Sequence, residues 1–165
     1  QFMQERYAGK LDMEILPIDQ LPLYCEDDEL NPPEIVIELR EKIKLSDGIL
    51  FATPEYNASI PGLLKNAIDW FSRVEKVMVG KPAMIIGASQ GALGTVKAQL
   101  QLRQILNAPG VSTLTLPGNE VYVGSVHEKI KDGKLIDEPT IEFIDSVIDQ
   151  FIEWIEKTVV YEASY

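Results

Sequence analysis

Short apolar runs alternate with amphipathic stretches along most of this chain, and that alternation constrains the fold more than any other feature. Residues 83–88 (AMIIGA) form a continuous apolar run, which is typical of a central parallel strand because such a strand is buried on both faces. Longer stretches on either side repeat their apolar residues at helical spacing. Strands that alternate with helices predict a doubly wound α/β fold, in which right-handed crossovers place helices on both faces of a parallel sheet.

The same pattern sets the order of the expected elements. We expect strands at residues 11–16, 47–52, 83–88 and 111–116. We expect one helix to start at Pro32–Pro33, and three more to run from Pro61 to about Arg73, from about Gly94 to Asn107 and from Pro139 to about Val159. Residues 17–31 are rich in proline and acidic side chains and predict a loop, whereas 117–138 predict a mixed excursion with a turn at Asp132 and Gly133.

Length, charge and composition fit one globular domain, residues 1–165, with a single substantial core. Acidic residues outnumber basic ones by 26 to 15, and the net charge of −11 argues against nucleic acid and anionic membrane surfaces as partners. No apolar stretch approaches the ~20 residues that span a bilayer, and no signal peptide is evident. Cys25, the only cysteine, fits a reducing compartment, so we expect a cytoplasmic protein. His127, the only histidine, cannot build a zinc site alone, and we expect no metal.

The loop that follows the second expected strand is the first candidate site. Pro54 fixes its own φ angle and ends the strand, and Ser59 is placed to cap the helix that follows. Between them lie Glu55, Tyr56 and Asn57, which no packing argument requires. Tyr56 offers a flat face with a polar tip, suited to flanking an aromatic ring, and ligands of open parallel sheets bind at the carboxyl ends of strands. A plain β-to-α loop with a good cap is the alternative interpretation.

The loop that follows the apolar run 83–88 is the second candidate site. Gly91 and Gly94 let the backbone approach a ligand closely, and the N–H groups at the start of the next helix suit polar or anionic groups. Ser89 and Gln90 complete an S-x-G-x-x-G pattern. This pattern alone is weak, and an ordinary β-to-α turn explains it at least as well. Its value comes from its position, because in a parallel sheet the two loops would lie side by side.

Residues 53–70 (TPEYNASIPGLLKNAIDW) closely resemble the P-E-Y-N-x-S-x-P-G-x-L-K-N-A-[IL]-D-[WF] signature of the NADPH-dependent FMN reductase family. The resemblance implies a flavodoxin-like fold with five parallel strands in the order 2-1-3-4-5. It also implies bound FMN, reduction by NADPH or NADH, and electron transfer to a small acceptor such as free flavin, a quinone, an azo dye or a metal oxyanion. The residues that the resemblance assigns to the cofactor are Pro54, Glu55, Tyr56, Asn57, Ser59, Ser89, Gln90 and Gly91. Because the flavin carries the chemistry, no catalytic side chain is expected.

Two other functions stay open on the sequence alone. A flavodoxin-type electron carrier, which exchanges single electrons with protein partners and is not an enzyme, would also be acidic. Such carriers, however, do not have the P-E-Y-N-x-S-x-P-G loop found at residues 54–62. A binding or scaffold protein that has lost its flavin is the third interpretation.

The resemblance further implies a homodimer or homotetramer, because in such proteins the helices after these two loops commonly pack against a second subunit. Trp70 and Phe71 extend the apolar character of their helix beyond one stripe, which indicates a second buried surface. Arg103 is either an interface residue or a solvated helix residue.

The start of the chain departs from the family pattern. Residues 1–7 (QFMQERY) look like the last turns of a first helix, whereas family members begin with an apolar strand and a G-S-x-R-x-x-S-x-N-type loop that cradles the FMN phosphate. In the order 2-1-3-4-5, that strand lies between residues 11–16 and 47–52. We therefore expect about 25 further residues, carrying this strand and loop, to precede Gln1 in the protein.

Overall fold

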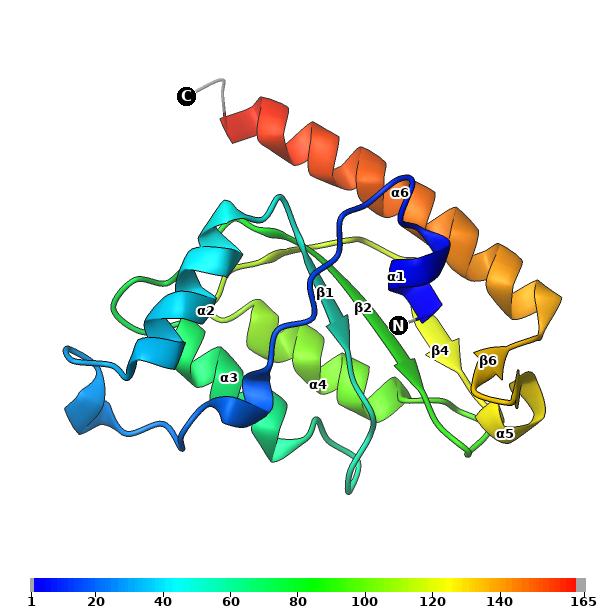
Figure 1. The fold of residues 1–165 in the computed structure, drawn as a ribbon, viewed down its shortest axis with the longest axis horizontal. Coiled ribbons are helices and arrows are strands. Elements are labelled where there is room, and N and C mark those ends of the chain that lie inside the picture. The colour runs from blue at the N-terminus through cyan, green and yellow to red at the C-terminus, as the bar shows by residue number, and fades with distance from the viewer. Residues whose placement is uncertain (1, 163–165) are drawn as a thin grey trace.

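In the computed structural model, which describes residues 2–162, a parallel sheet lies between helices on both faces (Figure 1). The helices are α1 (Phe2–Arg6), α2 (Glu34–Leu45), α3 (Gly62–Phe71), α4 (Val96–Leu106), α5 (Val126–Lys129) and α6 (Glu138–Glu162), with 3-10 turns at Ile18–Gln20 and Glu26–Asp28. The strands are β1 (Ile49–Ala52), β2 (Pro82–Ala88), β3 (Leu114–Thr115), β4 (Val121–Val123), β5 (Ile130–Lys131) and β6 (Lys134–Leu135). The predicted doubly wound α/β fold is confirmed.

The central strand of the sheet is β2, and every pairing with it is parallel. Ile86 is paired with Ala52 of β1 and with Val121 of β4, so these two strands lie on opposite sides of β2. On the side of β4, the pairing of Ala83 with Thr115 brings β3 against the first half of β2. The two short strands β3 and β4 therefore occupy one strand position, which is interrupted between them.

Only part of the strand predicted at residues 111–116 forms, namely β3, and β4 lies inside the predicted excursion 117–138. The interruption has a backbone cause, because Gly118 and Asn119 have φ angles of +64° and +49°, outside the range of a strand. The turn predicted at Asp132 and Gly133 is confirmed and connects the antiparallel pair β5 and β6.

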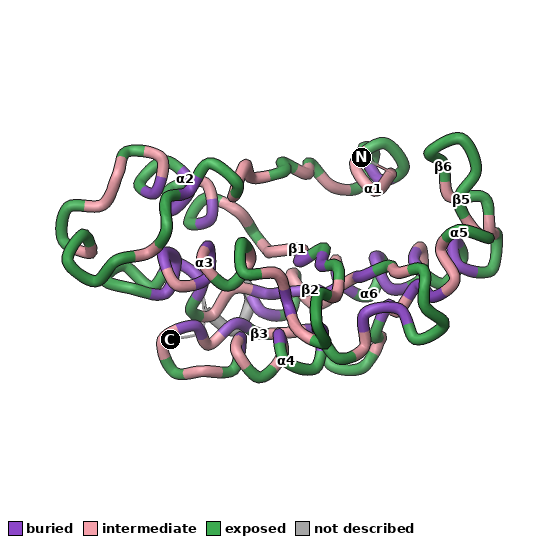
Figure 2. The backbone as a smooth tube through the Cα atoms, turned by 90° about the horizontal axis from the view of Figure 1, so that it is seen from below, coloured by how far each residue is buried: buried purple, intermediate pink, exposed green. Residues whose placement is uncertain are grey.

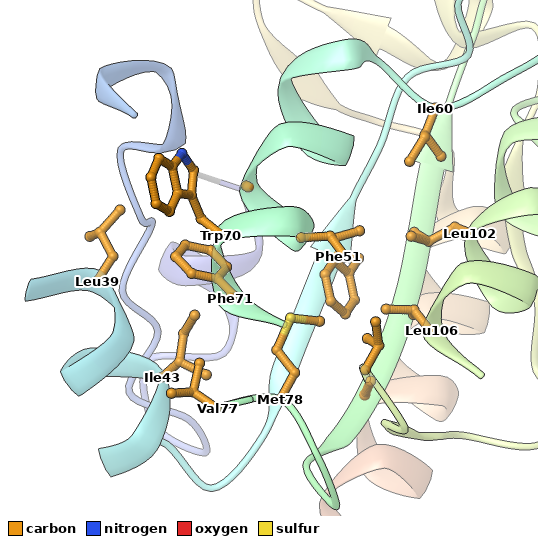
Figure 3. Close-up of a cluster of buried hydrophobic side chains, with 14 of the residues drawn as sticks. Leu39, Ile43, Phe51, Ile60, Trp70, Phe71, Val77, Met78, Leu102 and Leu106 are labelled. Carbon is orange, nitrogen blue, oxygen red and sulfur yellow. The ribbon is translucent and has the colours of Figure 1, made fainter. Parts of the chain in front are cut away.

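Alternate residues of β2 face two separate apolar clusters. Ala83 and Ile85 contact the cluster built by α2, α3 and α4, whereas Met84 belongs to the cluster built largely by α6. Figure 2 shows the buried residues gathered where the helices face the sheet, and Figure 3 shows part of the first cluster. The predicted inward residues of α2, Val36, Leu39 and Ile43, are all buried in this first cluster.

Trp70 and Phe71 correct one expectation. Both are buried within this chain, at 0% and 5% exposure, rather than on a second surface. The Trp70 indole N–H donates to the Pro22 carbonyl at 2.9 Å, and its ring meets the Tyr24 ring edge-on at 5.2 Å between centroids. The loop of residues 17–31 therefore covers Trp70, and Phe71 packs within the first apolar cluster, so neither residue indicates a second subunit.

The strand predicted at residues 11–16 is also wrong. These residues keep the predicted alternation in part, since Leu11 and Met13 pack against the second cluster while Asp12 and Glu14 are exposed. They form no sheet ladder, because a strand requires a hydrogen-bonded neighbour and no strand within residues 2–162 pairs with them. On the side away from β2, β1 likewise has no partner within residues 2–162.

The N-terminal helix is tied to α6 on the second face of the sheet. The Arg6 guanidinium donates to both carboxylate oxygens of Asp145 at 2.6 Å, and the buried Tyr7 hydroxyl donates to one of them at 2.7 Å. Residues 2–6 thus form a helix, as predicted, and Gln1 lies outside the described residues. Across residues 2–162, no helix combines the length and apolarity needed to cross a membrane.

Candidate functional site

The two predicted loops lie together at the carboxyl ends of β1 and β2, as the parallel pairing requires. The backbone N–H of Thr53 donates to the Ile86 carbonyl at 3.0 Å, which carries the pairing of the two strands into the first loop. Side chains then join the first loop to α4. The arrangement places residues 53–61 and 89–95 at one edge of the sheet, where open parallel sheets bind ligands.

A tight turn presents the Tyr56 side chain. Tyr56 and Ser59 exchange two backbone hydrogen bonds of 3.0 Å, and the residues between them, Asn57 and Ala58, have φ angles of +51° and +61°. Two positive φ angles in a two-residue connection define a type I′ turn, which asparagine tolerates well and alanine poorly. The turn leaves the Tyr56 side chain 62% exposed, at the same edge of the sheet as the second loop, so its ring is free to flank a planar ligand.

Glu55 joins the first loop to α4 by hydrogen bonds. Its carboxylate oxygen Oε2 accepts the backbone N–H groups of Lys97 and Ala98, at 2.9 and 3.1 Å, in the first turn of α4. A carboxylate at this position satisfies N–H groups that have no partner within the helix and complements the helix dipole. The Glu55 side chain therefore connects the loop after β1 to the helix after β2.

Ser59 does not cap α3, contrary to the prediction. The N-cap position of α3 is Pro61, and it has no side-chain cap hydrogen bond. The Ser59 hydroxyl instead donates to the Gln101 side-chain oxygen on α4 at 2.5 Å. Like Glu55, this serine fastens the first loop to α4.

The second loop exposes backbone donors. Ser89 folds inward, with its hydroxyl donating to the Gly94 carbonyl at 2.7 Å, while Gln90 and Gly91 are exposed. A Cβ at Gly91 would meet only the Ser89 hydroxyl, at 3.7 Å, so the approach to this backbone is open. Within the described part of the chain, the N–H groups of Gln90, Gly91 and Ala92 donate to no backbone carbonyl. An exposed aromatic ring and several unpaired N–H donors fit a planar heteroaromatic group that carries carbonyl and ring-nitrogen acceptors.

A third segment, which the sequence interpretation missed, reaches the same edge of the sheet. The Ser89 N–H donates to the Val123 carbonyl, and the N–H groups of Ser125 and Val126 donate to the Gly91 and Ser89 carbonyls, all at 3.0 Å. The signal in the sequence is Val121-Tyr122-Val123 followed by Gly124-Ser125, a β-prone triplet before two turn residues.

Around β4, burial and the Glu120 carboxylate raise the pKa of Tyr122 to about 12, which keeps this phenol protonated and neutral. Arg103 lies 3.5 Å from the same Glu120 carboxylate and is partly buried. This ion pair within the chain is neither of the two predicted roles, and a role of Arg103 at an interface stays a prediction.

Comparisons with known proteins agree with this geometry. The family model described as NADPH-dependent FMN reductase matches residues 1–128. The NADH:(hydroxy)cinnamate reductase subunit CrdA of Vibrio ruber is 37% identical, with 94% of this chain and 78% of the relative covered. The NADH-dependent flavin reductase subunit 2 of Lactobacillus johnsonii is 39% identical over 95% of this chain and 88% of its own length. A quinone reductase of Pseudomonas putida is 36% identical, with coverage of 93% and 83%.

A solved structure has the same architecture. The flavoenzyme NAD(P)H:(acceptor) oxidoreductase FerB from Paracoccus denitrificans superposes with a TM-score of 0.84 and 38% identity. The match covers 95% of this chain and 87% of the FerB chain.

Proposed function

The chain belongs to the NADPH-dependent FMN reductase family, and we propose that it holds FMN between the Tyr56 turn and the Ser89–Gly91 loop. It is an NAD(P)H-dependent flavoenzyme that reduces small acceptors, the activity class of its relatives. The single observation that carries the placement is the exposed Tyr56 ring at the sheet edge that also presents the unpaired N–H groups of the second loop.

Bound FMN supplies the redox chemistry, and the chain supplies binding and orientation. The Tyr56 ring would flank the isoalloxazine, and the N–H groups of residues 90–92 would donate to its polar edge. Glu55 and Ser59 hold the two loops at a fixed separation through α4. In this proposal Pro54 and Asn57 shape the turn that carries Tyr56.

The placement is tested by replacing Tyr56 and Asn57 together with alanine. Losing two or three contacts of about 1 kcal/mol each weakens FMN binding by roughly tenfold or more. The measurement is a flavin fluorescence titration of the two-residue variant and of the unmodified chain. A matched control replaces Phe143 and Asn31, an aromatic and an asparagine that are also exposed but lie outside both loops. Equal FMN affinity in both variants would refute the placement.

A second candidate function is that of an electron-input subunit. Two of the relatives are named as subunits of NADH-dependent reductases, which favours a partner chain as one acceptor. Turnover of NADH or NADPH with free flavin and with a quinone, measured on this chain alone, distinguishes the two functions. Full activity with the small acceptors supports the self-sufficient reductase, whereas turnover that requires a second chain supports the subunit.

We also propose a cytoplasmic homodimer or larger homo-oligomer. The only cysteine, Cys25, is free and exposed, which suits a reducing compartment.

Leu63 of α3 and Leu100 of α4 are exposed apolar residues on the two helices that follow the candidate loops. A specific interface would bury more than ~1,000 Å² in total. Sedimentation should show a dimer that dissociates in the variant Leu100→Glu. A monomer of the unmodified protein at micromolar concentration would contradict the assembly. Cell fractionation tests the location and should find the protein in the cytoplasm.

A further inference from the structure

Two glycines allow the segment after β4 to touch the backbone of the second loop. Gly124 is buried, and a Cβ at this position would overlap the Ala92 carbonyl, lying 2.7 Å from its carbon and 3.1 Å from the Gly91 oxygen. A real Cβ does not approach backbone atoms so closely, so the loop or the segment would have to move. The contact between residues 91–92 and 124 therefore depends on the absence of a side chain.

Gly94 makes the reciprocal contact from the loop. A Cβ there would lie 3.0 Å from the Tyr122 carbonyl carbon and 3.1 Å from the Val123 nitrogen, and its φ angle of +62° also favours glycine. The middle of the 89–94 loop and its last residue are thus fitted against the backbone of residues 122–124. Neither contact involves a side chain that would yield by rotating.

Hydrogen bonds complete the attachment. Three backbone bonds of 3.0 Å join Ser89 and Gly91 to Val123, Ser125 and Val126. The Ser125 bond holds the Gly91 carbonyl, so it fixes the orientation of the peptide that follows Gly91. That peptide carries the Ala92 N–H, one of the unpaired donors of the loop.

We propose that Gly124 is a positioning residue of the flavin site and that residues 123–126 hold the 89–94 loop in the shape that receives the cofactor. The inference rests on the proposed function, because it assumes that the Ser89–Gly91 loop borders FMN. It adds a part of the site that lies outside the family signature and far from it in sequence. Gly124 itself touches the loop rather than the cofactor.

The test is the variant Gly124→Ala, with Gly9→Ala as its matched control. The control makes the same chemical change where a Cβ would meet nothing within 4 Å. FMN titration should show binding weakened by at least about tenfold in Gly124→Ala and unchanged in Gly9→Ala. At saturating FMN, the visible absorption bands of the bound flavin should also differ from those of the unmodified protein, which a mere loss of stability would not produce.

Hydrogen exchange on the unmodified protein decides the matter if Gly124→Ala fails to fold. FMN binding should slow exchange of the Ser125 and Val126 N–H groups, since ordering the loop orders their acceptors. Unchanged exchange at both residues, or a folded Gly124→Ala with normal affinity and flavin spectrum, would overturn the inference. If the Tyr56 and Asn57 variant still loses FMN in that case, the proposed function stands; if it also binds normally, the proposed function fails as well.

Discussion

The Glu55 carboxylate lies 2.9 Å from the backbone nitrogen of Lys97 and accepts its N–H. The bond joins the loop after one strand to the helix after the next, so this side chain helps to set the distance between the two loops of the proposed flavin site. It also places a negative charge at the N-terminus of α4, where the helix dipole stabilises it. A residue inside the family signature thus joins the first candidate loop to the helix that follows the second.

Replacing Glu55 with alanine should lower the free energy of unfolding by about 1 kcal/mol, the usual cost of removing a helix cap. Glu55→Gln should cost less, because its side-chain oxygen still accepts a hydrogen bond. Urea denaturation measures both, with Glu142→Ala, an exposed glutamate of α6, as the control. If Glu55→Ala is no less stable than Glu142→Ala, the cap contributes nothing.

Ala58→Gly should make the protein more stable. Ala58 has a φ angle of +61°, which is costly for any residue with a Cβ, and glycine removes that cost. After the larger entropy loss of glycine, a gain of about 0.5 kcal/mol is expected. Ala8→Gly, at an exposed position whose φ angle is not positive, should bring no gain. Thermal unfolding of the two variants provides the comparison, and an equal change in both would contradict the strained turn.

Asn66 should control the order of the loop over α3. Its side chain accepts the Tyr24 N–H at 2.8 Å and donates to the Pro22 carbonyl at 2.9 Å. Asn66→Ala should therefore speed hydrogen exchange at the Tyr24 amide, whereas Asn66→Asp keeps the acceptor and should change that exchange little. The control is Asn107→Ala, at an exposed asparagine after α4. Equal exchange rates at Tyr24 in the alanine and aspartate variants would disprove this role.

Acid should weaken the attachment of α1 to α6. Hydrogen bonding by the Arg6 guanidinium lowers the pKa of Asp145 to about 2. Because this folded-state pKa lies below the unfolded value of about 3.9, the stabilisation is complete above about pH 4 and is lost as the pH falls toward 2. The free energy of unfolding should therefore fall less steeply with decreasing pH in Asp145→Asn than in the unmodified protein.

Chemical denaturation between pH 4 and pH 2 measures that slope. The control is Asp132→Asn in the turn between β5 and β6, where asparagine suits the φ angle of +50°. It should keep the slope of the unmodified protein. A slope in Asp145→Asn equal to that of the control would show that the Arg6 pair does not carry the pH dependence.

The sequence predicted the long elements well and the short ones poorly, for physical reasons. The helices α2, α4 and α6 have enough turns for an apolar stripe to define them, and β2 is apolar throughout because both its faces are covered. With three residues, β4 is too short to show an alternation. Residues 11–16 do alternate, but alternation does not supply a pairing partner.

At the proposed site, the sequence predicted that the two loops lie together but misassigned the contacts of individual side chains. Ser59 precedes a helix and is a good cap by composition, yet its hydroxyl reaches Gln101, a contact that only the packing of α4 reveals. Trp70 shows a similar limit, since an apolar surface does not say which segment covers it. The residues that hold the second loop, such as Gly124, are more than thirty positions away, and a local pattern does not contain that information.

The break between β3 and β4 gives one strand position two independent ladders to β2, where a continuous strand would have one. Each half is fixed to β2 by its own ladder, so residues 117–119 connect two anchored pieces and bear no ladder bond themselves. We expect a change of length there to leave both ladders in place, and with them the register of β4 beside the 89–94 loop. We therefore expect this connection to accept a label or a short inserted peptide without a change in either ladder.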